Sequence, residues 1–413
     1  MARIVDVAAR LVWDSRGRST VEAEVALKGA RGRAIAPAGA STGSGEAKSI
    51  DTKLAVRHVN TEIRQALLGK TLEQEAIDRA LIALDGTPDK SRLGGNAIVA
   101  VSLACAHAAA AAARKPLWRF LAGKDRAAMP VPQIQIFGGG AHAHARIDLQ
   151  DFMIVCHGAG SFTEALEWTA EVYRAAGARL AKRGALAGVA DEGGYWPAFR
   201  TNEEALAELT GAIADAGFEP GADVGIALDV AATQLWRDGK YHLALEKKAL
   251  TASQLHALLL KWIDGYPILS IEDPFAEHDA EAMASFTRTA GNRVQIVGDD
   301  FFVTSKEKLE QGKALGACNC VLLKPNQVGT LTETLACWRA ARAAGYNAIV
   351  SARSGETEDV TIVHLAVGWG VPQLKVGSFT RSERMAKWNE GIRIEEALGD
   401  AKLPYPARRL FRR

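Results

Sequence analysis

Six short apolar runs in the second half of the sequence each end in or beside a polar side chain. The first three, ADVGIALD, YPILSIED and RVQIVGDD, carry Asp229, Glu272 and Asp299 at their ends. Runs of Val, Ile and Leu are typical of strands buried on both faces of a parallel sheet. Carboxylates there are costly unless a cation meets them, which favours a divalent ion such as magnesium. The alternative, acids that only cap the following helices, suits Asp273 and Asp300 better.

The next three runs, NCVLLK, NAIVS and VPQLK, end on Lys324, Ser351 and Lys375. Successive ends lie roughly 25–45 residues apart, which is room for one strand, one helix and two short loops. Helical patterns such as 331–345, with Gly345 as a C-terminal stop, fill the intervals. The repeat predicts a β/α barrel with its active site at the C-terminal ends of the strands.

Composition excludes several classes of protein. The 50 Lys and Arg residues oppose 48 Asp and Glu residues, so a net charge of +2 implies no nucleic-acid partner. Five cysteines, mostly in apolar runs, indicate reduced thiols of a cytoplasmic protein. The first residues lack a secretory layout, and the run 104–113 is too short and too weakly hydrophobic to span a membrane.

The N-terminal part has a different pattern. Residues 1–35 alternate between apolar and polar side chains, which predicts antiparallel strands, and a loop rich in Gly, Ser and Thr follows at 37–47. Residues 51–122 have helical periodicity. We therefore expect an α+β domain at 1–128 and a barrel at 129–413.

Two further stretches contain candidate site residues. Glycines 138–140 allow close approach of the backbone, and polar residues follow them: His142, His144, Gln150 and Asp151. Asp191 and Glu192 precede two glycines, which alone is typical of a turn. Their place in the barrel order makes Glu192 a candidate.

A series of segments in order resembles the enolases over nearly the whole chain. They include DSRG (14–17), GASTG (39–43), LQDFMI (149–154), DEGG (191–194), LDVAAT (228–233), YPILSIEDPF (266–275), QIVGDD (295–300), LLKPNQVGT (322–330) and SARSGETED (351–359). The resemblance implies an N-terminal α+β capping domain on a modified, TIM-like β/α barrel. It also implies homodimers or higher oligomers and the glycolytic, magnesium-dependent dehydration of 2-phosphoglycerate to phosphoenolpyruvate.

The resemblance assigns the metal ligands. Asp229, Glu272 and Asp299 match the ligands of a tightly held magnesium ion. Ser41 matches a ligand of a second magnesium that arrives with substrate, so two ions per site are expected.

The same resemblance assigns the reacting groups. Lys324 matches the base that removes the proton beside the carboxylate, and Glu192 matches the acid that helps the hydroxyl leave. His142 and Asp151 match residues beside the substrate and the leaving hydroxyl. Substrate contacts are expected from Gln150, Arg353, Ser354, Lys375 and Ser41.

These roles require shifted pKa values. Cationic neighbours, Lys375 and magnesium, should lower the pKa of Lys324, because a base must be neutral. A nearby carboxylate such as Asp151 should raise the pKa of Glu192, because an acid must be protonated.

The chain departs from the enolase pattern around the leaving group. Ala352 stands in place of a His, and Asp151 in place of a Glu. Gly138, Ala141 and Gly45 replace Asn, Ser and His, while His144 replaces a small residue and is a candidate substitute for the lost imidazole.

Three hypotheses follow. The first is an ordinary enolase reaction. The second is altered leaving-group chemistry on a small phosphorylated or phosphonate carboxylic acid, as in a carboxyphosphonoenolpyruvate synthase of a phosphonate pathway. The third is a non-catalytic binding protein on an enolase scaffold, against which the retained buried charges argue.

Overall fold

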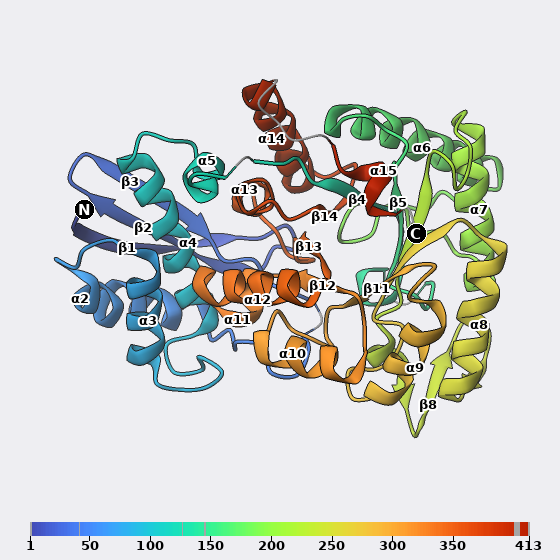
Figure 1. The fold of residues 1–413 in the computed structure, drawn as a ribbon, viewed down its shortest axis with the longest axis horizontal. Coiled ribbons are helices and arrows are strands. Elements are labelled where there is room, and N and C mark those ends of the chain that lie inside the picture. Colours follow the sequence, from blue (N-terminus) through green and yellow to red (C-terminus); the bar gives the residue numbers. More distant parts are fainter. Residues whose placement is uncertain (1, 41, 126, 144–145, 400–404, 412–413) are drawn as a thin grey trace.

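The computed structural model describes residues 2–40, 42–125, 127–143, 146–399 and 405–411. An N-terminal sheet with its helices lies beside a closed barrel that is surrounded by helices (Figure 1). The predicted α/β class, a modified β/α barrel with an N-terminal α+β domain, is confirmed.

The N-terminal sheet is antiparallel, as the alternation predicted. Its strands follow the order β1 (Ile4–Trp13), β2 (Ser19–Leu27) and β3 (Ala30–Ile35). Val7 pairs with Val25, and both side chains are fully buried. The period of two therefore gives the sheet one apolar face, which must be covered.

Helices cover that face. Those that contact the sheet are α1 (Thr52–His58), the π-helical turn η1 (Val59–Ile63), α2 (Arg64–Leu67) and α4 (Gly95–Ala112), while α3 (Gln74–Asp85) and α5 (Leu117–Ala122) pack against α4. A Cβ on Gly32 would lie 2.0 Å from the backbone nitrogen of Ala108, so glycine allows β3 to lie directly against α4.

Helix α4 corrects the prediction for the run 104–113. The run belongs to an 18-residue helix that is long and apolar enough to cross a membrane by length and composition. Most of the helix is buried in the N-terminal core, where a soluble protein also places such a helix.

The barrel contains eight strands in the order β10-β11-β12-β13-β14-β4-β5-β6. Their bounds are β4 (Val131–Gly138), β5 (Asp151–Val155), β6 (Gly225–Asp229), β10 (Ile268–Glu272), β11 (Gln295–Gly298), β12 (Cys320–Leu323), β13 (Asn347–Ser351) and β14 (Gln373–Ser378). The repeat predicted parallel strands, but β5 runs antiparallel to both β4 and β6. In the part of the β4–β5 link that the structure describes, the one helical element is the short 3₁₀ turn η2 (Gly140–Ala143), and the whole link is too short for a crossover helix.

The other barrel elements are mostly helices. They are α6 (Phe162–Lys182), α7 (Asn202–Asp215), η3 (Ala232–Leu235), α8 (Ala252–Gly265), α9 (Ala280–Ala290), α10 (Lys306–Leu315), α11 (Pro325–Val328), α12 (Leu331–Ala344), α13 (Thr361–Trp369), α14 (Ser382–Leu398) and α15 (Ala407–Leu410). A small sheet of β7 (Trp236–Arg237), β8 (Lys240–Leu243) and β9 (Lys248–Leu250) follows η3. The predicted stop of α12 is confirmed, because Gly345 has a φ of +74° after its last residue.

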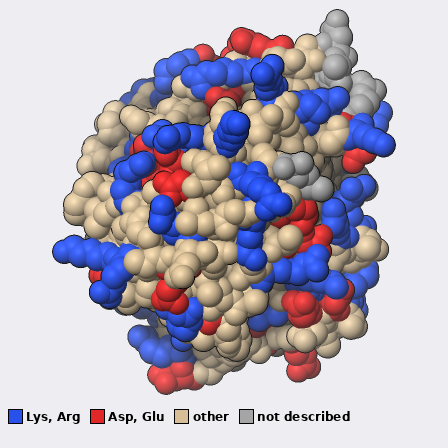
Figure 2. Space-filling view, turned by 90° about the vertical axis from the view of Figure 1, so that its left-hand side faces the viewer, with Lys and Arg blue, Asp and Glu red and all other residues tan. Residues whose placement is uncertain are grey.

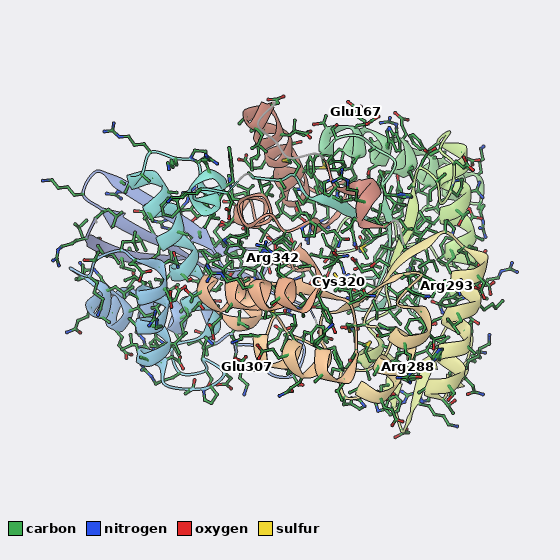
Figure 3. All side chains as sticks on the ribbon, viewed as in Figure 1. Glu167, Arg288, Arg293, Glu307, Cys320 and Arg342 are labelled. Atoms are coloured by element: carbon green, nitrogen blue, oxygen red, sulfur yellow. The ribbon has the colours of Figure 1, made fainter. Side chains whose placement is uncertain are left out.

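The barrel interior is apolar in part and amide-rich in part. Cys320 lies inside the barrel, while Arg288 and Glu307 extend from the surrounding helices (Figure 3). Gln133, Gln295 and Gln373 are buried and hydrogen-bonded to one another, with Gln133 Nε2 donating to Gln373 Oε1 at 2.7 Å. All five cysteines are buried free thiols, as expected.

The outer end of the N-terminal domain carries both signs of charge. Lys and Arg side chains are prominent on this face, with Asp and Glu beside several of them (Figure 2). Arg31 pairs with Glu24 at 2.7 Å, and Arg33 pairs with Glu22 at 3.4 Å. This pairing moderates the positive charge of the face.

Two histidines meet where α4 packs against the barrel helix α13. His107 Nε2 lies 2.8 Å from Thr361 Oγ1, and the His107 and His364 ring centroids are 6.3 Å apart. Burial lowers the pKa of both histidines, and the neighbouring ring also helps to lower the pKa of His364 to about 4, although Asp359 opposes this. The folded chain therefore favours the neutral form of both imidazole rings.

We predict that this contact weakens in acid. The unfolded chain binds a proton at His364 near pH 6.5, whereas the folded chain does so near pH 4, so the free energy of unfolding falls between those values. His364→Gln should remove up to about 3 kcal/mol of that acid loss. Urea unfolding at pH 7 and pH 4.5 measures it, with His242→Gln on an exposed hairpin as the control. Identical pH dependence in the parent and His364→Gln would contradict the prediction.

Candidate active site

Three predicted metal ligands lie together at the C-terminal mouth of the barrel. Asp229 and Glu272 are the last residues of neighbouring strands and pair in register, and Asp299 directly follows the next strand, β11. Their exposed fractions are 2%, 1% and 7%. Parallel strands that end at one level place these three residues at the same mouth of the barrel.

Lys375 neutralises this group from the opposite side of the barrel. Its Nζ lies 2.9 Å from Asp229 Oδ2, 2.9 Å from Glu272 Oε2 and 3.3 Å from Asp151 Oδ2. Burial lowers the pKa of Lys375, but these acids outweigh burial and hold the pKa well above its usual value. The prediction that Lys375 ends its strand is wrong, because β14 continues to Ser378.

The carboxylates fit a hard divalent cation. Burial and the neighbouring Asp229 raise the pKa of Glu272, and its Oε1 has no hydrogen-bond partner among the described residues. An acceptor oxygen that is buried beside like charges gains stability from a metal ion. The donor set is all carboxylate oxygen, which magnesium prefers. Asp229, Glu272 and Asp299 would therefore hold magnesium here.

Two further acids belong to this region. Asp273, Asp299 and Asp300 bring carboxylate oxygens within 4.8 Å of one another. Asp273 accepts hydrogen bonds from the backbone nitrogens of Asp299 at 2.9 Å and Asp300 at 2.7 Å. Capping was the wrong interpretation of Asp273 and Asp300, because Asp279 and Ser305 cap the following helices. Asp273 and Asp300 directly follow the predicted ligands Glu272 and Asp299, and this position in the sequence could have indicated that they belong to the acidic cluster.

Lys324 directly follows β12, and its ammonium group contacts Asp299 Oδ2. Burial lowers the pKa of Lys324 and so do Arg353 and Lys375, but Asp299 outweighs them and the pKa is raised. Lys375 thus lowers the pKa of Lys324 as predicted, but its effect is smaller than that of Asp299. A cation bound to Asp299 would compete with Lys324 for the same carboxylate.

His142 lies between two acids, Asp151 and Glu192. Its Nδ1 lies 3.1 Å from Asp151 Oδ1 and its Nε2 lies 3.9 Å from Glu192 Oε1. Burial lowers the pKa of His142, but the two carboxylates outweigh burial and raise it. Burial raises the pKa of Asp151, and His142 with Lys375 reverses that shift. The Asp151 carboxylate thus contacts His142 and Lys375. His142, Asp151 and Glu192 also bring ligand atoms within 4.8 Å of one another, so Asp151 is the nearby carboxylate that the sequence argument required beside Glu192.

The N-terminal domain closes one wall of the site. Arg353 Nη1 lies 2.9 Å from Glu46 Oε2, and Ser354 Oγ accepts a hydrogen bond from the Ala40 nitrogen at 2.6 Å. Glu46 was missed by sequence reasoning. Its carboxylate also accepts a hydrogen bond from Gln327 at 3.3 Å, so one acid links the loop to two barrel segments.

A small pocket with a cavity volume of about 20 Å³ joins these groups. Its lining includes the predicted residues His142, Gln150, Glu192, Asp229, Asp299, Lys324, Arg353, Ser354 and Lys375. Asp151 and Glu272 lie directly behind that lining, in contact with Lys375. Ser41 and His144 lie outside the described residues. Gln150 is fixed by a 3.0 Å hydrogen bond to Asp229.

Ala352 lines the same cavity as Glu192 and His142. It is 6% exposed, and its backbone nitrogen donates to the Lys375 carbonyl at 2.8 Å. The methyl group therefore stands where the resemblance predicted an imidazole. The replacement of histidine by Ala352 therefore changes the lining of the cavity.

We predict that Asp299→Asn weakens magnesium binding at least about tenfold, because the variant loses a charged ligand. Titration calorimetry measures the affinity, and magnesium-dependent thermal stabilisation gives a second readout. Asp264→Asn, which changes an exposed acid paired with Arg293, is the matched control. Equal affinity in parent and Asp299→Asn would contradict the assignment.

Two family models match the chain. Residues 4–121 match the model described as "Enolase, N-terminal domain", and residues 126–412 match the one described as "Enolase, C-terminal TIM barrel domain". Together the matches cover most of the chain.

Proposed function

Since the chain belongs to the enolase family, we propose that it is a magnesium-dependent lyase that dehydrates 2-phosphoglycerate to phosphoenolpyruvate. One observation carries the proposal. A base candidate, Lys324, and an acid candidate, Glu192, reach one buried cavity that also contains carboxylates suited to magnesium. Elimination requires both groups around one small acid.

The family resemblance gives each residue a role in this reaction. Lys324, as the neutral amine, accepts the proton that leaves carbon 2. Arg353 and Ser354 bind the phosphate, and Lys375 with Gln150 orients the substrate carboxylate. Magnesium, when bound, stabilises the negative charge that develops on that carboxylate.

The leaving hydroxyl needs a proton. Glu192 delivers it at carbon 3, and His142 holds Glu192 and Asp151 in a fixed relation through its two ring nitrogens. Burial of all three side chains excludes bulk water, which strengthens these interactions.

The proposal extends to the setting of the protein. We infer a cytoplasmic, glycolytic homodimer or higher homo-oligomer with a small phosphorylated acid as its partner and with no nucleic-acid or membrane partner. The edge strand β1 exposes 67% of Trp13 and 53% of Val5, which supports coverage by a second copy.

A second candidate function rests on Ala352. With an alanine in the cavity, the groups for proton removal are complete and those for hydroxide departure are reduced by one imidazole. This observation favours a substrate with a different group at carbon 3, including a phosphonate acid of the kind used by carboxyphosphonoenolpyruvate synthase. A purely binding role is disfavoured, because it has no use for buried, mutually repelling carboxylates.

We predict that the protein exchanges the carbon-2 hydrogen of 2-phosphoglycerate in heavy water and that Lys324→Ala reduces exchange by at least about 10²-fold. Proton NMR follows the exchange. Lys240→Ala, on the exposed β7–β8 hairpin, should exchange at the parental rate. Persistent exchange in Lys324→Ala would show that another group is the base.

We also predict that carbon-2 exchange survives while phosphoenolpyruvate forms about 10²–10⁴-fold more slowly than in ordinary enolases, because the histidine tied to the leaving-group step is replaced by Ala352. Ala352→His should recover part of that loss. The ratio of exchange to dehydration rates measures the effect. A parent that dehydrates as fast as it exchanges would eliminate the second candidate function.

A further inference from the structure

Gln135 is a buried side chain on β4 that none of the steps above uses. It is fully buried, and its amide nitrogen donates to Asp151 Oδ1 on β5. Its amide oxygen accepts a hydrogen bond from the Gly194 nitrogen at 2.8 Å. One amide therefore joins β4, β5 and the loop that carries Glu192.

Two glycines, Gly194 and Gly138, lie directly against the Gln135 amide. A Cβ on Gly194 would lie 2.5 Å from Gln135 Oε1. A Cβ on Gly138 would lie 2.5 Å from the Ala190 Cβ and 3.3 Å from Gln135 Nε2. Glycine at 138, where the resemblance predicted Asn, thus makes room for the amide and for the Glu192 loop.

Backbone hydrogen bonds hold the Glu192 loop on both sides of Gly194. The Tyr195 nitrogen donates to the Ile136 carbonyl at 2.9 Å, and the Ser378 nitrogen donates to the Glu192 carbonyl at 2.9 Å. The Gln135 contact at Gly194 lies between these two anchors. Displacement of the amide would therefore move the acid relative to the substrate.

The lengths of the two side chains are matched. The resemblance predicted Glu at position 151, and Asp is shorter by one methylene group. Asp151 Oδ1 nevertheless meets two donors, Gln135 Nε2 and His142 Nδ1, because glutamine is long enough to reach it. Without Gln135, the carboxylate would be held by Lys375 and His142 alone.

We propose that Gln135 is a positioning residue that sets Asp151 and Glu192 for departure of the leaving group, and that its length compensates for the shorter Asp151. The proposal rests on the proposed function, since it concerns the second half of that reaction. Gln133 provides the contrast: it lies two residues earlier on β4, is equally buried and bonds to Gln373, away from the cavity.

The test shortens the side chain at position 135, lengthens the one at position 151, and combines both changes. The variants are Gln135→Asn, Asp151→Glu and the double variant, with Gln133→Asn as the matched control. Carbon-2 exchange and phosphoenolpyruvate formation are measured separately on 2-phosphoglycerate with magnesium. Gln135→Asn should slow product formation about 10²-fold, because misplacement by about 1 Å has that effect. Its exchange rate and KM should stay close to those of the parent.

The double variant should form product at least about tenfold faster than Gln135→Asn, since it restores the combined length. Gln133→Asn should leave the ratio of exchange to product formation unchanged. If Gln135→Asn does not fold, Gln135→Glu keeps the length, loses the amide donor, and should show the same selective loss of product formation. A proportional fall of both rates, or a double variant no better than the slower single variant, would overturn the proposal.

A second readout does not depend on the substrate. In crystals of Gln135→Asn, the Asp151 carboxylate should turn away from His142 toward Lys375, and Gly194 should shift. Unchanged positions would overturn the positioning role. If the parent exchanges no hydrogen from 2-phosphoglycerate, the proposed function fails, while the crystal comparison still decides the role of Gln135.

Discussion

One buried ammonium group balances the charges at the barrel mouth. Lys375 contacts Asp229, Glu272 and Asp151 within 3.3 Å, and all four side chains are almost completely buried. Carboxylates in such a place are tolerated only with compensating cations. The contact also joins Asp229 and Glu272 to Asp151, so the charges of these three acids are balanced by one group.

The other walls depend on contacts between distant segments. Glu46 from the N-terminal domain fixes Arg353, and His142 and Gln135 fix the acids on β5 and the Glu192 loop. These groups come from separate elements, and each holds its partner by directional hydrogen bonds. The departures from the enolase pattern at Gly138 and Asp151 lie among these contacts.

Local patterns predicted much of this arrangement. The apolar runs located β6, β10, β11, β12 and β13, and their polar ends located the candidate metal ligands and Lys324. The antiparallel direction of β5 escaped prediction, because DFMIV is an apolar run that suits either direction. The place of Asp273 and Asp300 in the acidic cluster was not predicted either. An acid next to a candidate ligand gives the same sequence pattern whether it caps a helix or belongs to the cluster.

The sequence by itself determined which chemical groups are present and at which strand ends they occur, because strand periodicity and turn residues are local properties. It also showed that Ala352 replaces an imidazole. Only the tertiary structure decided the pairing of charges: Lys324 with Asp299, Lys375 with three acids, and Gln135 with Asp151. Electrostatic shifts depend on distances of a few ångströms between side chains far apart in the chain. No local pattern encodes those distances, and for that reason the direction of the Lys324 pKa shift emerged only from the folded chain.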